Sequence, residues 1–281
     1  RIPFYLDDDH RIYTSLRVNK SDPLYFLIDT GASDMVVNSE VLWKFDITLN
    51  STASNTGATG ENIVELSTGN TVVWGKHETK PLDFVAIPYP DALWDGVLGL
   101  SLLKQFVVEL NYDDMHVYLY DKKRYKSTAS NKVILTYAHG VPVVKAMVKT
   151  ADQKTRSLRL EIDTGSDRIL DISTHIVNTH HLLKFYPKPF AKSTVMSSDG
   201  NSGDIINDFF PMVELGGFEF YKIPGGLAQV PNGILNKPDI DGMLGNWFLK
   251  RFNLTFDFEN DYLYLRPNNY VHSAYYEFLT R

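Results

Sequence analysis

The sequence predicts a mostly β protein built from two homologous lobes with a few short helices, and three observations favour this fold class. The tripeptide Asp-Thr-Gly occurs twice, starting at Asp29 and at Asp163, and each copy ends an apolar run. Each copy is followed by a second repeated element, Asp95-Gly96-Val97-Leu98-Gly99 in the first half and Asp241-Gly242-Met243-Leu244-Gly245 in the second. The length of 281 residues also corresponds to about two domains.

The similarity of the two halves continues beyond these glycines. Residues 107–113 and 117–120 align with residues 253–259 and 263–266, and both pairs predict a β-hairpin with a polar turn. The glycines Gly99 and Gly245 are 245 − 99 = 146 positions apart, whereas the aspartates are 163 − 29 = 134 apart. A lone Asp-Thr-Gly is weak support, because Asp and Gly are common turn residues. Two copies with matching continuations predict two lobes rather than a short-period solenoid.

Periodicity predicts the elements within each lobe. In the first lobe, residues 11–18 alternate as in a strand, and the apolar residues 24–28 form a strand that delivers Asp29 to a turn. In the second lobe, residues 141–148 and 157–162 form the equivalent pair of strands. Residues 41–45 and 176–185 are short helical candidates after the two turns, and most of the remaining chain is predicted to be β.

Each half carries a Gly-rich polar segment between its aspartate and its later glycine, residues 55–60 and 197–204. Both predict hairpins, and loops on a rigid scaffold often bind ligands. We therefore take them as candidate flaps over a substrate, with an ordinary surface hairpin as the alternative. The residues chosen for this role are Thr59, Gly60, Gly200 and Asn201.

A solvated linker is predicted between the lobes. The basic cluster of residues 122–126 runs into a polar stretch at residues 127–132. The expected domains are residues 1–128 and residues 129–281.

Composition excludes several classes of function. The net charge of −6 argues against a nucleic-acid partner, which would require a basic face. The absence of cysteine rules out thiol catalysis and disulfides. The longest apolar stretches, such as residues 97–103, are too short for a membrane helix. Because the chain begins with Arg1, we expect that an N-terminal segment has been removed, which favours a periplasmic or secreted location while leaving the compartment open.

Two matched carboxyl groups suit hydrolysis by an activated water molecule. One group takes a proton from water while the other donates a proton to the carbonyl oxygen, and side by side the two cannot both ionise easily. The hydroxyls of Thr30 and Thr164 are expected to hydrogen-bond across the lobe junction and fix the turns, and Gly31 and Gly165 to allow close backbone approach. Such a site requires no metal and no cofactor.

Neighbouring residues are assigned supporting or structural roles. Gly99 and Gly245 are expected to lie against the aspartate turns, where a larger side chain would clash. Asp95 and Asp241 precede glycine, which favours a turn or capping role. Asp34 and Asp167 are predicted to cap the following helices.

Other hydrolytic chemistries have less support. No Gly-x-Ser-x-Gly elbow is present, which disfavours a serine hydrolase. The neighbours His180 and His181 would point in different directions on a helix, so we assign them no metal site. A glycosidase also uses two carboxylates, but nothing in the sequence pairs the other acids that it could use, namely Glu109, Asp113, Glu161 and Asp241.

The motifs resemble those of the aspartic peptidase superfamily, in which pepsins have two lobes and retroviral proteases assemble the same site from two identical subunits. The segments 28–32 and 97–103 look more retroviral than pepsin-like. The resemblance implies a bilobal pepsin-like acid protease fold with catalytic roles for Asp29 and Asp163. It implies supporting roles for Thr30, Gly31, Thr164, Gly165 and Ser166. Two departures are the lack of a tyrosine in the first flap candidate and the presence of Ala32, where pepsins usually have a hydroxyl that supports the carboxylate.

The sequence therefore predicts an aspartic endopeptidase that binds a peptide or protein substrate between its lobes and is active as a monomer. Two alternatives keep the same fold. One is a catalytically silent peptide-binding module, because fold does not guarantee function. The other is an autoinhibited precursor whose cleft is filled by its own tail, residues 268–281.

Overall fold

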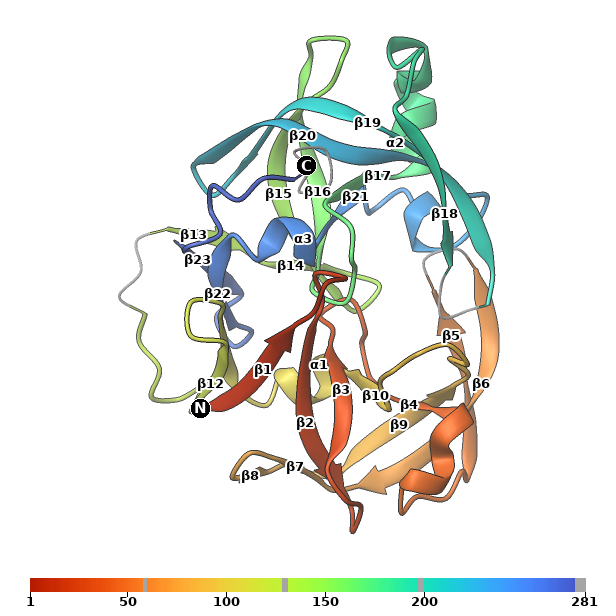
Figure 1. Ribbon diagram of the computed structural model, residues 1–281, viewed down its shortest axis with the longest axis vertical. Helices are drawn as coiled ribbons and strands as arrows, with labels where there is room; N and C mark the ends of the chain where they lie inside the picture. The colour runs from red at the N-terminus through yellow and green to blue at the C-terminus, as the bar shows by residue number, and fades with distance from the viewer. Residues whose placement is uncertain (58–59, 128–130, 197–199, 276–281) are drawn as a thin grey trace.

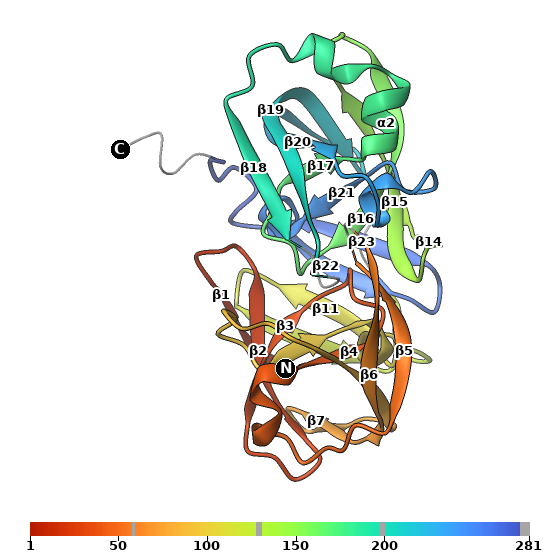
Figure 2. The same cartoon turned by 90° about the vertical axis from the view of Figure 1, so that its right-hand side faces the viewer.

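The computed structural model describes residues 1–57, 60–127, 131–196 and 200–275. It is bilobal and mostly β with a few short helices, which confirms the predicted fold class (Figure 1). In both views the red-to-yellow first lobe lies below the green-to-blue second lobe (Figures 1 and 2). Within the described ranges, no helix has the length and apolar character needed to cross a membrane.

The first lobe is one continuous part of a larger sheet, with two short strands, β7 and β8, beside it. Along the sheet its strands follow the order β11-β12-β1-β2-β3-β10-β4-β9-β6-β5, and β7 pairs with β2 and β8. The elements are β1 (Ile2–Leu6), β2 (Ile12–Val18), β3 (Leu24–Ile28), β4 (Met35–Asn38), η1 (Ser39–Lys44), β5 (Ser51–Thr56), β6 (Glu61–Asn70), β7 (Val72–Trp74), β8 (His77–Glu78), β9 (Leu82–Ile87), β10 (Gly96–Leu98), α1 (Leu100–Leu103), β11 (Val107–Asn111) and β12 (His116–Tyr120).

The second lobe has its own sheet in the order β14-β15-β16-β21-β17-β20-β19-β18. Its elements are β13 (Lys132–Ile134), β14 (Thr136–Ala138), β15 (Val141–Lys149), β16 (Thr155–Asp163), β17 (Leu170–Ile172), α2 (Thr174–Thr179), η2 (Leu182–Phe185), β18 (Ala191–Met196), β19 (Ser202–Leu215), β20 (Phe218–Gln229), η3 (Ile234–Asn236), β21 (Gly242–Gly245), α3 (Asn246–Leu249), β22 (Phe252–Asp257) and β23 (Tyr262–Pro267).

The strands that carry the two motifs have the same surroundings in both lobes. β10 pairs in parallel with β3 and antiparallel with β4, and β21 pairs in parallel with β16 and antiparallel with β17. The predicted strands around Asp29 and Asp163 are therefore present, and so are the hairpins β11–β12 and β22–β23.

The helical predictions need one adjustment. The first candidate is the 3-10 helix η1. The second is split into α2 and η2 because His181 adopts a left-handed backbone conformation (φ 50°), which interrupts an α-helix.

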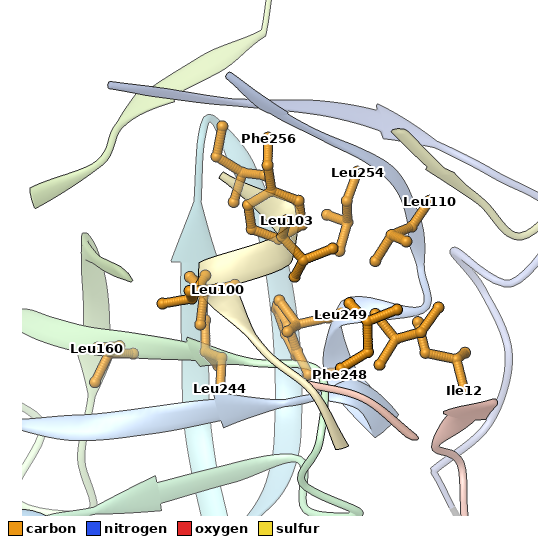
Figure 3. Packing of buried hydrophobic residues seen from close by; sticks show 14 of the residues in the cluster. Ile12, Leu100, Leu103, Leu110, Leu160, Leu244, Phe248, Leu249, Leu254 and Phe256 are labelled. Atoms are coloured by element: carbon orange, nitrogen blue, oxygen red, sulfur yellow. The ribbon is translucent and has the colours of Figure 1, made fainter. Parts of the chain in front are cut away.

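The lobes share strands and a core. β11 of the first lobe pairs antiparallel with β22 of the second, so one sheet crosses from the first lobe into the second. The buried hydrophobic cluster includes Leu103 and Leu110 from the first lobe together with Phe248 and Leu254 from the second (Figure 3). The predicted division near residue 128 falls on residues outside the described ranges and stays a prediction.

Candidate active site

Asp29 and Asp163 lie together, each at the C-terminal end of its strand. Asp29 follows β3 directly, and Asp163 is the last residue of β16. Asp29 Oδ1 accepts hydrogen bonds from the backbone N–H groups of Gly31 (2.7 Å) and Ala32 (3.1 Å). Asp163 Oδ1 accepts matching bonds from Gly165 (2.8 Å) and Ser166 (3.1 Å). Each carboxyl lies against the glycine of the opposite turn, and each affects the pKa of the other, so the structure joins the two acids that the sequence placed in matched frames.

The two threonines hold the turns together across the lobes. Thr30 Oγ1 donates to Ile162 O (2.5 Å), and Thr164 Oγ1 donates to Ile28 O (2.9 Å). The backbone N–H of each threonine donates to the hydroxyl of the other at 3.1 Å. Both side chains are fully buried. Because buried polar groups are costly when unpaired, this reciprocal set fixes how the two aspartates face each other.

Gly31 and Gly165 leave room for the carboxyl of the opposite lobe. A Cβ atom at Gly31 would lie 2.8 Å from Asp163 Cγ, and one at Gly165 would lie 2.2 Å from Asp29 Cγ. Real Cβ atoms do not approach other atoms so closely. A side chain at either position would therefore push the carboxyls apart.

Gly99 and Gly245 lie against the backbone after the aspartate turns. A Cβ atom at Gly99 would be 2.0 Å from Asp34 O, and one at Gly245 would be 2.3 Å from Arg168 O. The hydroxyl of Ser166 accepts from the backbone N–H of Arg168 (3.2 Å). Ser166 thus supports Asp163 through its backbone N–H, as Ala32 supports Asp29, and its hydroxyl faces elsewhere.

Asp95 and Asp241 tie strands together instead of capping turns. Asp95 Oδ2 accepts from the backbone N–H of Tyr25 (2.8 Å) and its Oδ1 binds Lys44 Nζ (2.6 Å). Asp241 Oδ2 accepts from the backbone N–H and Nε of Arg159 (2.8 and 3.0 Å), and its Oδ1 accepts from Arg159 Nη2 (2.8 Å). Asp95 therefore links β10 to β3, and Asp241 links β21 to β16, the strands that lead to Asp29 and Asp163.

The prediction that Asp34 and Asp167 cap helices is wrong. After each aspartate turn the chain first forms a strand, β4 or β17, before the helix begins. The helix N-caps are Asn38, which accepts from Glu40 N, and Ser173, which accepts from Ile176 N.

Glu161 is a third carboxyl at this site, which the sequence analysis did not assign to it. The side chain is 5% exposed. A Cβ atom at Gly31 would lie 3.0 Å from Glu161 Oε1, next to Asp163. The available signal was strand alternation, since residues two apart on a strand point to the same face.

All three carboxyls have raised pKa values, and burial is the largest cause for each. Burial raises the pKa of Asp29, although hydrogen bonds from Asp163, Gly31 and Ala32 act in the opposite direction. Burial and the charges of Asp29 and Glu161 raise the pKa of Asp163 well above its ordinary value. Burial, followed by the charge of Asp29, raises the pKa of Glu161 to about 8. At neutral pH the group is therefore partly protonated, as required for combined acid and base chemistry.

The flap candidates lie on two hairpins, since β5 pairs with β6 and β18 pairs with β19 (Figure 1). Gly60 and Asn201 line the same polar groove of about 530 Å³, together with Asn236 of η3 and residues on either side of it. The first hairpin also contacts η3 directly, because Ile234 N donates to Gly57 O (3.2 Å). Gly200 has a left-handed backbone (φ 79°), and Thr59 lies outside the described residues.

The described part of the C-terminal tail packs against Arg251 of the second lobe. Arg251 Nη2 donates to Ser273 O (2.8 Å), and its guanidinium lies 3.7 Å from the centre of the Tyr275 ring. Residues 276–281 are outside the described ranges. Among the described residues, no group of three or more His, Asp or Glu side chains has an arrangement that could hold a metal ion.

A bilobal β fold with paired Asp-Thr-Gly turns is the arrangement expected of an aspartyl protease. Residues 14–102 match a family model described as aspartyl protease. The matched segment contains Asp29 and Gly99 and covers most of the first lobe, and it supports an aspartyl protease family and a peptidase function in general. No curated protein matches the chain.

Proposed function

We propose that this chain is an aspartic endopeptidase whose two lobes are copies of one unit and together form a single site. The observation that carries the proposal is the adjacent pair Asp29 and Asp163, each with two backbone N–H donors on Oδ1 and each against the glycine of the opposite turn. The family match to the first lobe supports the reaction class. Because both aspartates come from one chain, a monomer suffices for activity, with the substrate between the lobes.

The reaction follows from one shared proton. The ionised carboxyl of the pair takes a proton from a water molecule, and the water oxygen attacks the peptide carbonyl carbon. The protonated carboxyl donates its proton to the carbonyl oxygen, which gives a neutral tetrahedral diol. The carboxyl that now holds the proton donates it to the peptide nitrogen, while the other carboxyl takes a proton from a hydroxyl of the diol. The C–N bond breaks, the free amine and acid leave, and the pair again holds one proton. The raised pKa values of Asp29 and Asp163 keep one proton on the pair over a wide pH range.

The test is cleavage of a mixed library of unstructured peptides between about pH 3 and 8. We expect cutting that is blocked by a statine-type transition-state analogue, since such analogues bind the catalytic state selectively. Asp29→Asn and Asp163→Asn should each reduce kcat by about 10³-fold or more, because each removes one half of the proton exchange. Circular dichroism should show that both variants remain folded.

Asp121→Asn is the matched control, because it makes the same chemical change at an exposed position after β12. It should cut as fast as the unmodified protein. A near-normal rate in either active-site variant would contradict the shared-proton mechanism. Analogue binding without any cutting would favour the non-catalytic module instead.

A further inference from the structure

In each lobe, the residue two positions before the aspartate lies side by side with one residue from each neighbouring strand. The two rows of three differ in chemical character at one position. In the first lobe, Leu27 lies in register between Tyr13 of β2 and Val97 of β10. At the matching place in the second lobe, two residues before Asp163, Glu161 lies between Val143 of β15 and Met243 of β21. Five of these six residues are apolar or aromatic, and the sixth is an acid.

The side chains of Leu27 and Glu161 point away from the large hydrophobic cluster. On β3, Phe26 and Ile28 belong to the large hydrophobic cluster, whereas Leu27 belongs to a separate small cluster with Tyr13 and Val97. On β16, Leu160 and Ile162 belong to the large cluster, so strand alternation places Glu161 on the same face as Asp163. Leu27 and Glu161 thus flank the pair of aspartates, one from each lobe.

Glu161 lacks the partner that a buried acid needs. It is 95% buried, and the described residues supply neither a hydrogen bond nor a salt bridge to its carboxyl. Its strand neighbours Val143 and Met243 are apolar, and the charges nearest to it are those of Asp29 and Asp163. A buried carboxyl without a donor costs free energy in the folded protein unless a ligand supplies the missing charge.

We propose that Glu161 determines substrate specificity by receiving the side chain of a lysine or arginine next to the scissile bond. Leu27 and its apolar row receive an apolar side chain on the other side of that bond. The inference rests on the proposed endopeptidase function, because it needs a peptide lying across Asp29 and Asp163. A cation at Glu161 would gain a charge-assisted hydrogen bond, whereas a neutral side chain would leave the carboxyl unpaired. An acidic side chain would be rejected by three carboxyls.

The experiment identifies cut sites in the peptide library by mass spectrometry and then compares matched peptides. These peptides carry lysine or norleucine, which has nearly the same shape without the charge, at the position that the library selects. The unmodified protein should prefer lysine by about tenfold or more in kcat/KM. Glu161→Gln should bring the ratio close to one. Glu161→Leu, which installs the residue of the first lobe, should reverse it, while the preference on the other side of the bond stays unchanged.

A second readout does not depend on turnover. Statine-type analogues with lysine or norleucine at the same position are titrated calorimetrically in two buffers that differ in ionisation enthalpy. Because free Glu161 holds its proton at neutral pH, the lysine analogue should release up to about one more proton than the norleucine analogue. The difference should vanish in Glu161→Gln. A merely structural glutamate would show no such difference.

Three results would overturn the inference. Cut sites that show no preference for a basic residue beside the bond would do so and leave the proposed function standing, as would an unchanged lysine preference in Glu161→Gln. If the unmodified protein neither cut any peptide nor bound either analogue, the proposed function would fail and this inference with it.

Discussion

The residue with the largest unexpected influence on the site is Glu161. It shares a desolvated space with Asp29 and Asp163, so at neutral pH the folded chain binds protons that the unfolded chain would release. The site thus reduces stability in order to hold proton-sharing acids close together. Functional sites commonly contain such arrangements.

Replacement of Glu161 should change how stability depends on pH. The pKa of Glu161 is about 8 in the folded chain and near 4.5 when unperturbed. The stability that it contributes is therefore fully present below pH 4.5 and is lost as the pH rises towards 8. Relative to the unmodified protein, Glu161→Gln should gain up to about 3 kcal/mol in unfolding free energy between pH 4 and pH 7.

Urea unfolding at a series of pH values measures the unfolding free energy of Glu161→Gln and of the unmodified protein. Asp121→Asn serves as the control, since an exposed acid should shift the whole curve by less than about 0.5 kcal/mol. Parallel pH profiles for Glu161→Gln and the unmodified protein would show that Glu161 is ionised in the folded state.

At the scale of elements, the position of each aspartate depends on the strand beside it. β10 and β21 begin with a glycine that follows Asp95 or Asp241, and these acids bind the neighbouring strand β3 or β16. The two acids are 7% and 6% exposed. They differ in the number of donors, because Arg159 offers three and the first lobe offers one each from Tyr25 and Lys44.

This difference predicts unequal effects of one substitution. Asp241→Asn should destabilise the chain by about 2–3 kcal/mol and Asp95→Asn by about 1–2 kcal/mol, because charge-assisted bonds are stronger and more of them are lost in the second lobe. Chemical denaturation at pH 7 gives both values in one experiment. Equal losses of unfolding free energy, or a larger loss for Asp95→Asn, would show that the bonds between Asp241 and Arg159 do not stabilise the second lobe more than those of Asp95 stabilise the first.

At the scale of the whole molecule, the lobes are joined too extensively to behave independently. Strand pairing between β11 and β22, a common hydrophobic cluster and the reciprocal threonine bonds all cross between them (Figure 3). Asn246 adds a buried link, since it accepts from Tyr112 Oη (2.6 Å) and donates to His10 O (2.7 Å). Separation of the lobes would expose apolar surface and leave buried polar groups unpaired.

We therefore expect the chain to unfold as one cooperative unit. Hydrogen exchange followed by mass spectrometry at increasing urea should give the same midpoint for peptides from β3 and β16 as for the bulk of each lobe. Two clearly separated midpoints would show that the lobes are stable on their own.

The sequence by itself determined the fold class, the strands that lead to Asp29 and Asp163, and the hairpin that follows Gly99 and Gly245 in each lobe. These features follow from local periodicity and from repeated spacing, which are properties of the chain alone. The helix caps were wrong because Asp34 and Asp167 are followed by a strand, and a short apolar run does not reveal where a helix begins.

The tertiary structure decided which groups meet across the lobes. Strand alternation placed Glu161 and Asp163 on one face, yet only the approach of the first lobe brings Asp29 and Gly31 against them. In the same way, the sequence predicted that the threonine hydroxyls bond across the lobe junction, but only the packing of the lobes shows that they donate to Ile162 O and Ile28 O. Contacts between residues more than 130 positions apart depend on how two sheets pack, and local sequence does not encode that packing.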